Sequence, residues 1–382
     1  MEHTVKLFYE DTVIKEFDAA VLSCEPEKDG YKAVLDRTAF FPEGGGQYGD
    51  IGWIDGIRVT DTREKEGIVY HCIEEALEIG KKVHGTLNWD IRFERMQQHS
   101  AEHIVSGIIH RRFGYENVGF HLGADYCTMD FNGPITKDQL REIEEEANHA
   151  VFANLPVHVL YPDKEGLAQM KYRSKIEIEG QVRIIEIPGV DVCACCAPHV
   201  EFTGQIGLIK LVDMTNYKGG ERINMLSGIR ALTDYQKKQE SVRRIGSILC
   251  EQEEKLVDAV EHLKQESIRL KGEIVGLRRQ ILKNKAGETD VSADVVVVFD
   301  EEISGDEPRE YMNLLLERGA KVCAVFAGTD ENGYRYVIGS RTEDVRPLNQ
   351  MLKESFGARG GGKPEMVQGS LTGVRDKIKA LL

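Results

Sequence analysis

Two short segments carry the side chains best suited to chemistry in this chain. HSAEH contains His99 and His103, and CCAPH contains Cys195 and His199, with the members of each pair four positions apart. On a helix this spacing places two side chains on one face, a turn apart, so that both reach the same ion. Three imidazoles and one thiolate suit tetrahedral zinc, whose usual protein donors are histidine nitrogen and cysteine sulfur. We therefore predict that these four residues share one Zn²⁺ ion.

The identity of the sulfur donor is open among three neighbouring cysteines. Of the eight cysteines in the chain, Cys193, Cys195 and Cys196 lie within four residues of one another. Because the first residues show no secretion-signal pattern, this grouping favours metal ligation over a disulfide framework. Two histidines on one helix are also common at surfaces and in cores, so the metal prediction depends on both segments together.

Two other zinc motifs do not match. HSAEH is not the HExxH of zinc peptidases, which includes a glutamate as general base. Neither His99 nor His103 begins the H-x-E of nucleobase deaminases, and Pro198 follows the cysteines instead of preceding them. The sequence therefore favours neither a zinc peptidase nor a deaminase.

A glycine-rich segment near the C-terminus, GARGGGKP, resembles a phosphate-binding P-loop. Gly357, Gly362 and Lys363 have the required spacing, but Pro364 stands where a serine or threonine would bind magnesium. The segment also follows a predicted helix rather than a strand, so we do not expect nucleotide hydrolysis. Read as a loop, it could still cradle a phosphate backbone through its amides. The candidate RNA-binding residues are Arg359, Gly360, Gly361, Gly362 and Lys363.

Length and composition describe a globular chain of two or three domains. The chain has 382 residues, of which 41% are hydrophobic and 30% charged. No run approaches 18 apolar residues, so we expect a cytoplasmic protein with no membrane partner. The net charge of −15 argues against nonspecific nucleic-acid binding by the whole surface. From Ser340 onward, however, the chain has eight Lys and Arg residues and only five acidic residues, which fits one confined contact with a polyanion.

The pattern of elements predicts an α+β fold. Residues 1–90 alternate short apolar runs with turns and read as an N-terminal β domain. At its centre, FFPEGGGQYG has three adjacent glycines, which indicate either a wide turn or a loop that lets substrate approach the main chain. Residues 91–233 form the predicted zinc-containing α+β domain, in which a helix over 90–113 carries the two histidines of HSAEH.

A long helix and a last small domain follow. Leucines recur every seven residues from Leu249 to Leu277, which predicts a coiled-coil helix over 234–285. Glu253 and Ser267 fall on the second seam, and a long helix packed on its own chain is the alternative. Residues 286–382 show three strands and two or three helices, which predict a small α/β domain.

Six segments, in order, resemble the alanyl-tRNA editing proteins of the AlaX family in its long form. They are TAFFPEGGGQYGDIG, QHSAEHIVSG, GFHLG, CCAPHVEFTGQIGLIKL, KGGERINMLSG and GARGGGKPEMVQGS. The last resembles the DHHA1 signature that ends alanyl-tRNA synthetase, and the match covers nearly the whole chain. The sequence departs from the family at Cys196, Ala197 and Pro198, where the family has Gly-Gly-Thr. The Cys-x3-His frame is kept, and Cys193 or Cys196 could replace Cys195.

The resemblance implies a trans-editing hydrolase that removes serine, and also glycine, from the 3′ end of tRNA(Ala). A pocket for alanine cannot reject glycine by size and rejects one added hydroxyl only weakly, so a second sieve is needed. Thr38 and Gln47, which flank the glycine triplet, are candidates for recognising the serine hydroxyl; the alternative is turn hydrogen bonding. The resemblance also implies zinc, a DHHA1-like tRNA-binding domain over 286–382 and, with the heptads, a homodimer.

For the reaction, zinc would polarise the ester or a bound water. No Ser/His/Asp arrangement indicates an acyl-enzyme, and without a recognisable ATP-binding element we expect editing without charging. There are two alternatives to this function, one in a different class of protein and one with a different substrate. One is a noncatalytic RNA-binding module with structural zinc, and the other is an editing hydrolase of the threonyl type, which shares the histidine and Cys-x3-His frame.

Overall fold

The computed structural model describes residues 3–174 and 181–382, and it confirms the α+β fold class. The chain divides into two compact units, residues 1–244 and 245–382. Among the described residues, no helix is both long enough and apolar enough to cross a membrane.

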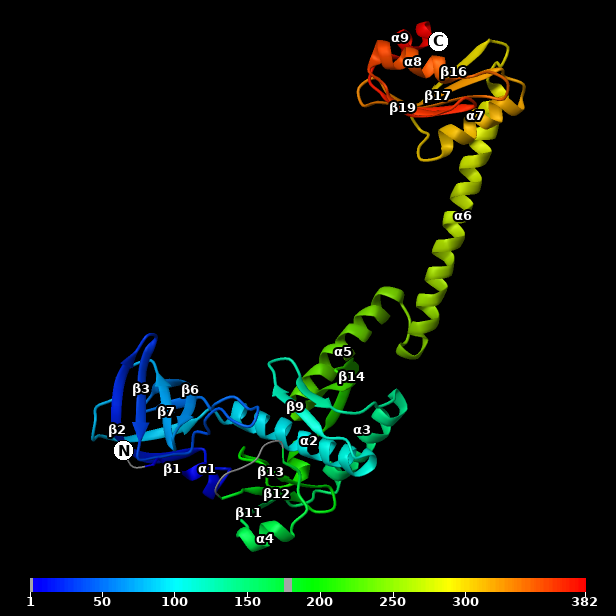
Figure 1. Cartoon of the computed structure of the whole chain (residues 1–382). Coiled ribbons are helices and arrows are strands. Elements are labelled where there is room, and N and C mark those ends of the chain that lie inside the picture. The colour runs from blue at the N-terminus through cyan, green and yellow to red at the C-terminus, as the bar shows by residue number, and fades with distance from the viewer. Residues whose placement is uncertain (1–2, 175–180) are drawn as a thin grey trace. The chain divides into compact units, whose positions relative to one another are not determined.

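The first part of unit one is a closed β-barrel (Figure 1). Its strands, in hydrogen-bonded order, are β2 (Glu16–Glu27), β3 (Gly30–Leu35), β7 (Ile68–Ile73), β6 (Ile57–Lys65), β5 (Gly52–Ile54) and β8 (Lys82–Leu87). Buried side chains alternate along β8, as expected for a strand with one face toward a core. Short strands β1 (Val5–Lys6) and β4 (Arg37–Thr38) pair beside the barrel, and α1 (Leu7–Glu10) follows β1 directly in the chain.

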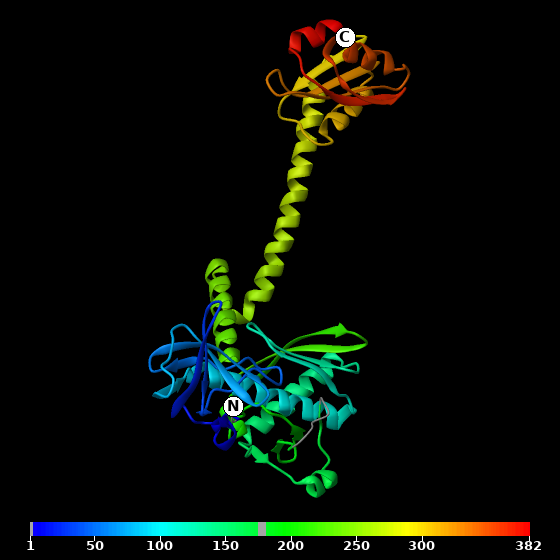
Figure 2. The same ribbon diagram turned by 60° about the vertical axis from the view of Figure 1, so that its left-hand side comes forward.

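Helix α2 (Trp89–Phe113) follows the barrel and is the central element of unit one (Figure 2). The side chain of Asn88 caps its first turn, and Gly114 ends it in the left-handed conformation, so both termini follow the rules for helix ends. Every residue from Met96 to Ile109 is buried. The helix is therefore enclosed all round, and the polar side chains on it need partners inside the protein.

Two sheets and several helices surround α2. A four-stranded sheet has the order β14 (Ile209–Tyr217), β15 (Gly220–Ser227), β10 (Cys127–Phe131), β9 (Asn117–Leu122), and a three-stranded sheet the order β11 (His158–Leu160), β12 (Ile184–Ile187), β13 (Asp191–Ala194). Helix α3 (Lys137–Phe152) begins with a capping box from Thr136 and Gln139. Helix α4 (Lys164–Gln169) and the short helix η1 (Thr203–Ile206) complete this part.

The single helix predicted over 234–285 is interrupted, which corrects that prediction. Helix α5 (Gly228–Leu249) ends before Cys250, which has a φ of 54°, and α6 (Leu256–Glu288) starts after the short helix η2 (Glu253–Lys255). The break separates the first heptad leucine from the second. The remaining seam on α6 is exposed: Val260, Leu263, Leu270, Ile274, Leu277 and Ile281 are all 44–66% accessible. Coiled-coil pairing of α6 stays a prediction.

The C-terminal sheet has five strands instead of the three predicted. Its order is β16 (Val295–Asp300), β17 (Val322–Thr329), β18 (Gly333–Ser340), β20 (Met366–Leu371), β19 (Arg359–Lys363), and only β16 and β17 are parallel. Helix α7 (Glu307–Glu317) covers one face, and α8 (Arg346–Phe356) and α9 (Arg375–Leu381) cover the other (Figure 1). The end of α6 joins this core through Leu282 and Ala286.

The predicted glycine-rich loop over 359–363 is wrong, because this segment is edge strand β19. Gly360 lies opposite Gly369, and an added Cβ on either would come within 2.7 Å of the Tyr336 hydroxyl oxygen. The glycines therefore leave room for the Tyr336 side chain, whose hydroxyl donates to Asn349 across 2.6 Å. Glycine is usually depleted in strands, which is why the sequence pattern indicated a loop.

Candidate metal centre

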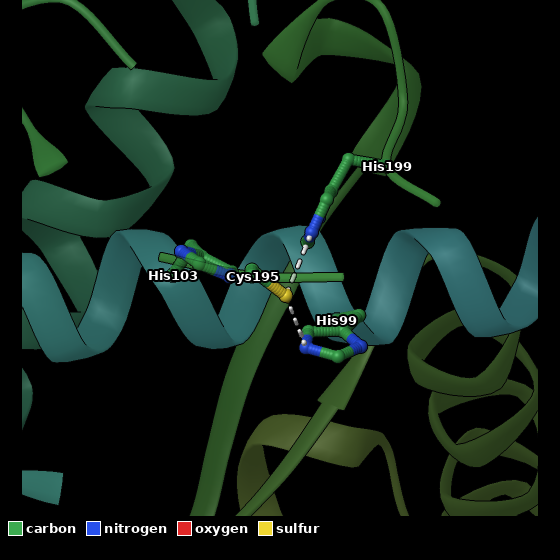
Figure 3. A group of neighbouring side chains, drawn as sticks. All are labelled: His99, His103, Cys195 and His199. Carbon is green, nitrogen blue, oxygen red and sulfur yellow. Dashed lines mark hydrogen bonds between the residues drawn. The ribbon is translucent and has the colours of Figure 1, made fainter. Parts of the chain in front are cut away.

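The structure brings together the four predicted ligands, His99, His103, Cys195 and His199 (Figure 3). The two histidines of HSAEH project from neighbouring turns of α2 and are each 2% exposed. Cys195 and His199 lie in the irregular segment that follows β13. The i, i+4 spacing therefore reflects a helix for the first pair but not for the second. Cys195 and His199 lie in a bent segment that brings both side chains toward the two histidines of α2.

The distances within this group suit a tetrahedral zinc site. All four ligand atoms lie within 4.8 Å of one another. The Cys195 Sγ atom is 3.5 Å from His99 Nε2 and 3.4 Å from His199 Nε2. Zn–S and Zn–N bonds of about 2.3 and 2.0 Å at tetrahedral angles place sulfur and nitrogen about 3.5 Å apart. The donor set and its spacing therefore fit a zinc ion.

Each histidine of the group has an oxygen partner behind it. His99 Nδ1 is 3.1 Å from Gln47 Oε1, and His199 Nδ1 is 3.2 Å from Ser100 Oγ. His103 Nδ1 is 2.9 Å from an Asp191 carboxylate oxygen. When Nδ1 carries the proton and donates it outward, the Nε2 lone pair is free to face a metal. Sequence reasoning missed Ser100 and Asp191, because nothing in their spacing marks them as partners of histidines so far along the chain.

The irregular segment with the sulfur donor is held by a buried arginine. Arg183 Nη1 donates to the carbonyl oxygens of Cys195 and Ala197 across 2.9 and 2.8 Å. The Cys195 amide in turn donates to the Arg183 carbonyl oxygen across 3.1 Å. This clamp fixes a stretch that belongs to no helix or strand.

The surroundings of Cys195 favour its thiolate. Burial opposes ionisation of this thiol, yet nearby His99 together with hydrogen bonds from His103 and His199 outweighs it and holds its pKa well below the usual range. Burial also lowers the pKa of His199 to about 3, so this ring is neutral at physiological pH. A thiolate and neutral imidazoles are the forms that bind zinc.

The two alternative cysteines lie differently. Cys193 is buried and groups with His103 and Asp191 instead of with all three imidazoles. Cys196 is exposed, and its Sγ atom lies 3.3 Å from the position of an added Cβ on Gly45. Although the residue as a whole is exposed, desolvation of its sulfur atom raises the pKa of the Cys196 thiol to about 11, which disfavours the thiolate. The geometry therefore favours Cys195 as the sulfur ligand.

The glycine triplet of the barrel lies beside the four-residue group. Gly44 and Gln47 exchange two backbone hydrogen bonds of 3.0 Å, which close a tight turn. Gly45 and Gly46 have φ values of 61° and 81°, a region that favours glycine. An added Cβ on Gly45 would lie 3.9 Å from the His99 ring. The main chain thus passes close to the candidate metal ligands. Close approach of substrate to this turn stays a prediction.

The two residues predicted to recognise substrate occupy different places. Gln47 is 1% exposed, and its Oε1 accepts from His99, whereas its amide nitrogen finds no hydrogen-bond partner among the described residues. Thr38 is fully buried, and its hydroxyl oxygen lies 2.8 Å from Nε2 of His71 and accepts from the Phe40 amide. Gln47 therefore adjoins the four-residue group, whereas Thr38 is hydrogen-bonded within the barrel.

The predicted RNA-binding residues belong to unit two and not to this site. Arg359, Gly361 and Lys363 are exposed on β19, and no ion pair is found for Arg359 or Lys363 among the described residues. Their role stays a prediction, with an edge strand in place of the expected loop.

Comparison with known proteins relates the chain to tRNA editing. Residues 182–246, which include Cys195 and His199, match the family described as threonyl and alanyl tRNA synthetase second additional domain. Over 98% of its length the chain is 29% identical to the alanyl-tRNA editing protein AlaX-L of Pyrococcus horikoshii, 96% of which is covered. The resemblance to the long AlaX proteins is confirmed. Residues 4–91, which contain the barrel, match class II (A) tRNA synthetases.

Two further relatives extend the AlaX resemblance. The alanyl-tRNA editing protein Aarsd1 of Rattus norvegicus is 28% identical over 97% of the chain and 96% of its own length. The alanine–tRNA ligase of Pyrococcus furiosus is 30% identical over 99% of the chain, but the chain spans only 43% of that ligase. The similarity to AlaX-type proteins is thus end to end, whereas the similarity to the ligase covers less than half of it.

Proposed function

We propose that this protein is a trans-editing hydrolase that removes serine, and also glycine, from mischarged tRNA(Ala). The observation that carries the proposal is the buried group of three histidines and one cysteine beside a glycine turn, in a chain similar end to end to alanyl-tRNA editing proteins. Hydrolysis of the ester to the 3′-terminal adenosine releases the free amino acid and an uncharged tRNA.

Four side chains would hold the zinc ion: His99, His103, Cys195 and His199. When bound, a zinc ion supplies Lewis-acid polarisation of an ester carbonyl or of a water molecule. The outer partners Gln47, Ser100 and Asp191 hold the three imidazoles in the required tautomer. A buried position keeps bulk water away from these groups and strengthens their electrostatic interactions.

Gln47 would contribute a hydrogen-bond donor to the reaction site. Its carbonyl oxygen accepts from His99, so only the amide nitrogen, which has no partner in the part of the chain that the structure describes, is left for substrate. Such a donor can bind the serine hydroxyl oxygen or the developing negative charge on the ester oxygen. The neighbouring glycines let the aminoacyl end approach the backbone without meeting a Cβ. Thr38, at the end of β4, would act on specificity indirectly, because its hydrogen bonds to His71 and Phe40 hold the segment that leads to the glycines.

Unit two would bind the body of the tRNA and pair two copies of the chain. The exposed Arg359 and Lys363 on β19 supply positive charge for a phosphate backbone. The exposed apolar seam of α6 suits pairing with the same helix of a second copy. Leu263→Asp should convert a dimer to a monomer in analytical ultracentrifugation, whereas Lys264→Asp, one position off the seam, should leave the dimer unchanged.

The decisive experiment is a substrate panel. We expect release of serine and glycine from Ser-tRNA(Ala) and Gly-tRNA(Ala), and little release from Ala-tRNA(Ala). His99→Ala should abolish this activity, while His110→Ala, an exposed histidine on the same helix, should retain it. Release from Ser-tRNA(Thr) alone would favour the threonyl-type alternative. Tight tRNA binding with no release from any substrate would favour the noncatalytic RNA-binding alternative.

A further inference from the structure

A buried carboxylate and a buried arginine lie directly behind His103. Asp191, at the start of β13, places one carboxylate oxygen 2.9 Å from His103 Nδ1. Arg173 donates to both oxygens of the same carboxylate, from Nε and from Nη2, each across 2.8 Å. The exposed fractions of the three side chains are 2%, 2% and 7%. The three groups therefore form one buried chain of hydrogen bonds that ends at a candidate metal ligand.

This arrangement determines which nitrogen of His103 faces the metal centre. A carboxylate only accepts, so Nδ1 must carry a proton, and Nε2 is the nitrogen that remains to bind a metal. An unpaired carboxylate in this position would be too costly to desolvate, and the bidentate contact with Arg173 compensates for that cost. Arg173 thus acts on the metal ligand through Asp191, without touching the ligand itself.

A glycine in helix α2 makes the approach of Asp191 possible. Gly107 lies one turn after His103 on the same face of the helix. An added Cβ at this position would lie 2.5 Å from the Val190 carbonyl oxygen and 2.7 Å from the Asp191 Cβ. Glycine inside a helix costs about 1 kcal/mol relative to alanine. Its presence here is explained by the close passage of the Val190–Asp191 backbone.

We propose that Asp191, held by Arg173 and admitted by Gly107, is a positioning residue that sets the zinc affinity of His103. The inference rests on the proposed metal function of the four-residue group. A second zinc site is the competing interpretation, because His103, Asp191 and Cys193 also lie within ligand distance of one another. The guanidinium on both Asp191 oxygens opposes it, since a second cation would have to displace Arg173.

The test is the zinc dissociation constant of the full chain, measured by competition with a chelator. Asp191→Asn should weaken zinc binding about 10- to 100-fold, the range typical of outer partners of metal-binding histidines. Asp130→Asn is the matched control, because Asp130 also makes a bidentate pair with an arginine, Arg222, away from the site. This control should bind zinc as tightly as the wild type.

Loss of folding is separated from loss of positioning by a second variant. Asp191→Asn combined with Arg173→Met removes both buried charges, so it should fold better than Asp191→Asn alone and still bind zinc weakly. The denaturation midpoint of the metal-free proteins, measured in parallel, shows whether folding changed.

Three outcomes would decide against the inference. Wild-type zinc affinity in both Asp191 variants, with binding lost in His103→Ala, would overturn the positioning role and leave the metal centre intact. Wild-type affinity in His103→Ala as well would overturn the metal centre itself. Two zinc ions per wild-type chain, one of them lost in Asp191→Asn, would establish the second zinc site instead.

Discussion

His71 offers a prediction with a magnitude that follows from the structure. It is fully buried in the barrel, where Nδ1 donates to the Ala33 carbonyl oxygen across 3.2 Å and Nε2 accepts from the Thr38 hydroxyl across 2.8 Å. These two hydrogen bonds, one donated and one accepted, require the neutral form of the ring. Burial accordingly lowers the pKa of His71 from 6.5 to about 4.

The consequence is a loss of stability as the pH falls. The unfolded chain binds a proton on His71 near pH 6.5, whereas the folded chain resists it until about pH 4. In this window the unfolded state holds more protons, so the free energy of unfolding decreases with decreasing pH. The loss is about 1.4 kcal/mol per pH unit below pH 6.5. Between pH 7 and pH 5, His71 therefore lowers the free energy of unfolding by about 2 kcal/mol.

The assay is denaturant unfolding of the wild type and of His71→Gln at pH 7 and pH 5. The wild type should lose about 2 kcal/mol more than the variant over this interval, because glutamine does not titrate. His84→Gln is the control: His84 is exposed, and its hydrogen bond with Asp18 raises its pKa. Its stabilising effect is therefore present at low pH and lost as the pH rises, the opposite sign. Equal pH dependence in the wild type and His71→Gln would refute the reasoning.

Three further predictions concern the barrel, the glycine turn and unit two. Asp50→Ala leaves the buried guanidinium of Arg92 without its counter-charge, so it should lower the free energy of unfolding by about 3–5 kcal/mol. The calorimetric melting temperature should fall by roughly 6–20 °C, and an unchanged value would contradict this. Gly46→Ala places a Cβ 2.9 Å from the Phe120 carbonyl oxygen at a φ of 81°, so displacement of the turn by about 1 Å should reduce deacylation about 100-fold at normal zinc content. A chain ending at Gln252, before α6, should keep its zinc but bind tRNA more weakly in filter-binding assays; undiminished affinity would show that unit two does not bind the tRNA.

The helix that carries two of the histidines, the chemical types of the metal ligands and the fold class could be predicted from the sequence. Helix α2 appears as expected because Asn88 and Gly114 mark its ends and a buried stretch lies between them. The four candidate ligands are predictable from their chemical type. They come together if the two short segments fold toward each other. The α+β class followed from the alternation of short strand-like and helical patterns.

Features that depend on tertiary contacts could not be predicted. Cys195 and His199 share the helical spacing but lie in an irregular segment whose path is fixed by Arg183, a contact between distant backbone and side-chain groups. Gly360 in strand β19 leaves space for the Tyr336 side chain, which no local pattern reveals. Asp191 lies 88 positions from His103, so its role becomes visible only when both are placed in space.

X-ray absorption of the zinc-loaded protein tests the metal centre most directly. We expect one zinc ion per chain with one sulfur ligand at about 2.3 Å and three nitrogen ligands at about 2.0–2.1 Å. The sulfur contribution should disappear in Cys195→Ser and persist in Cys196→Ser. A shell with two or more sulfur atoms, a shell of oxygen alone, or a chain that binds no zinc would contradict a shared centre formed by His99, His103, Cys195 and His199.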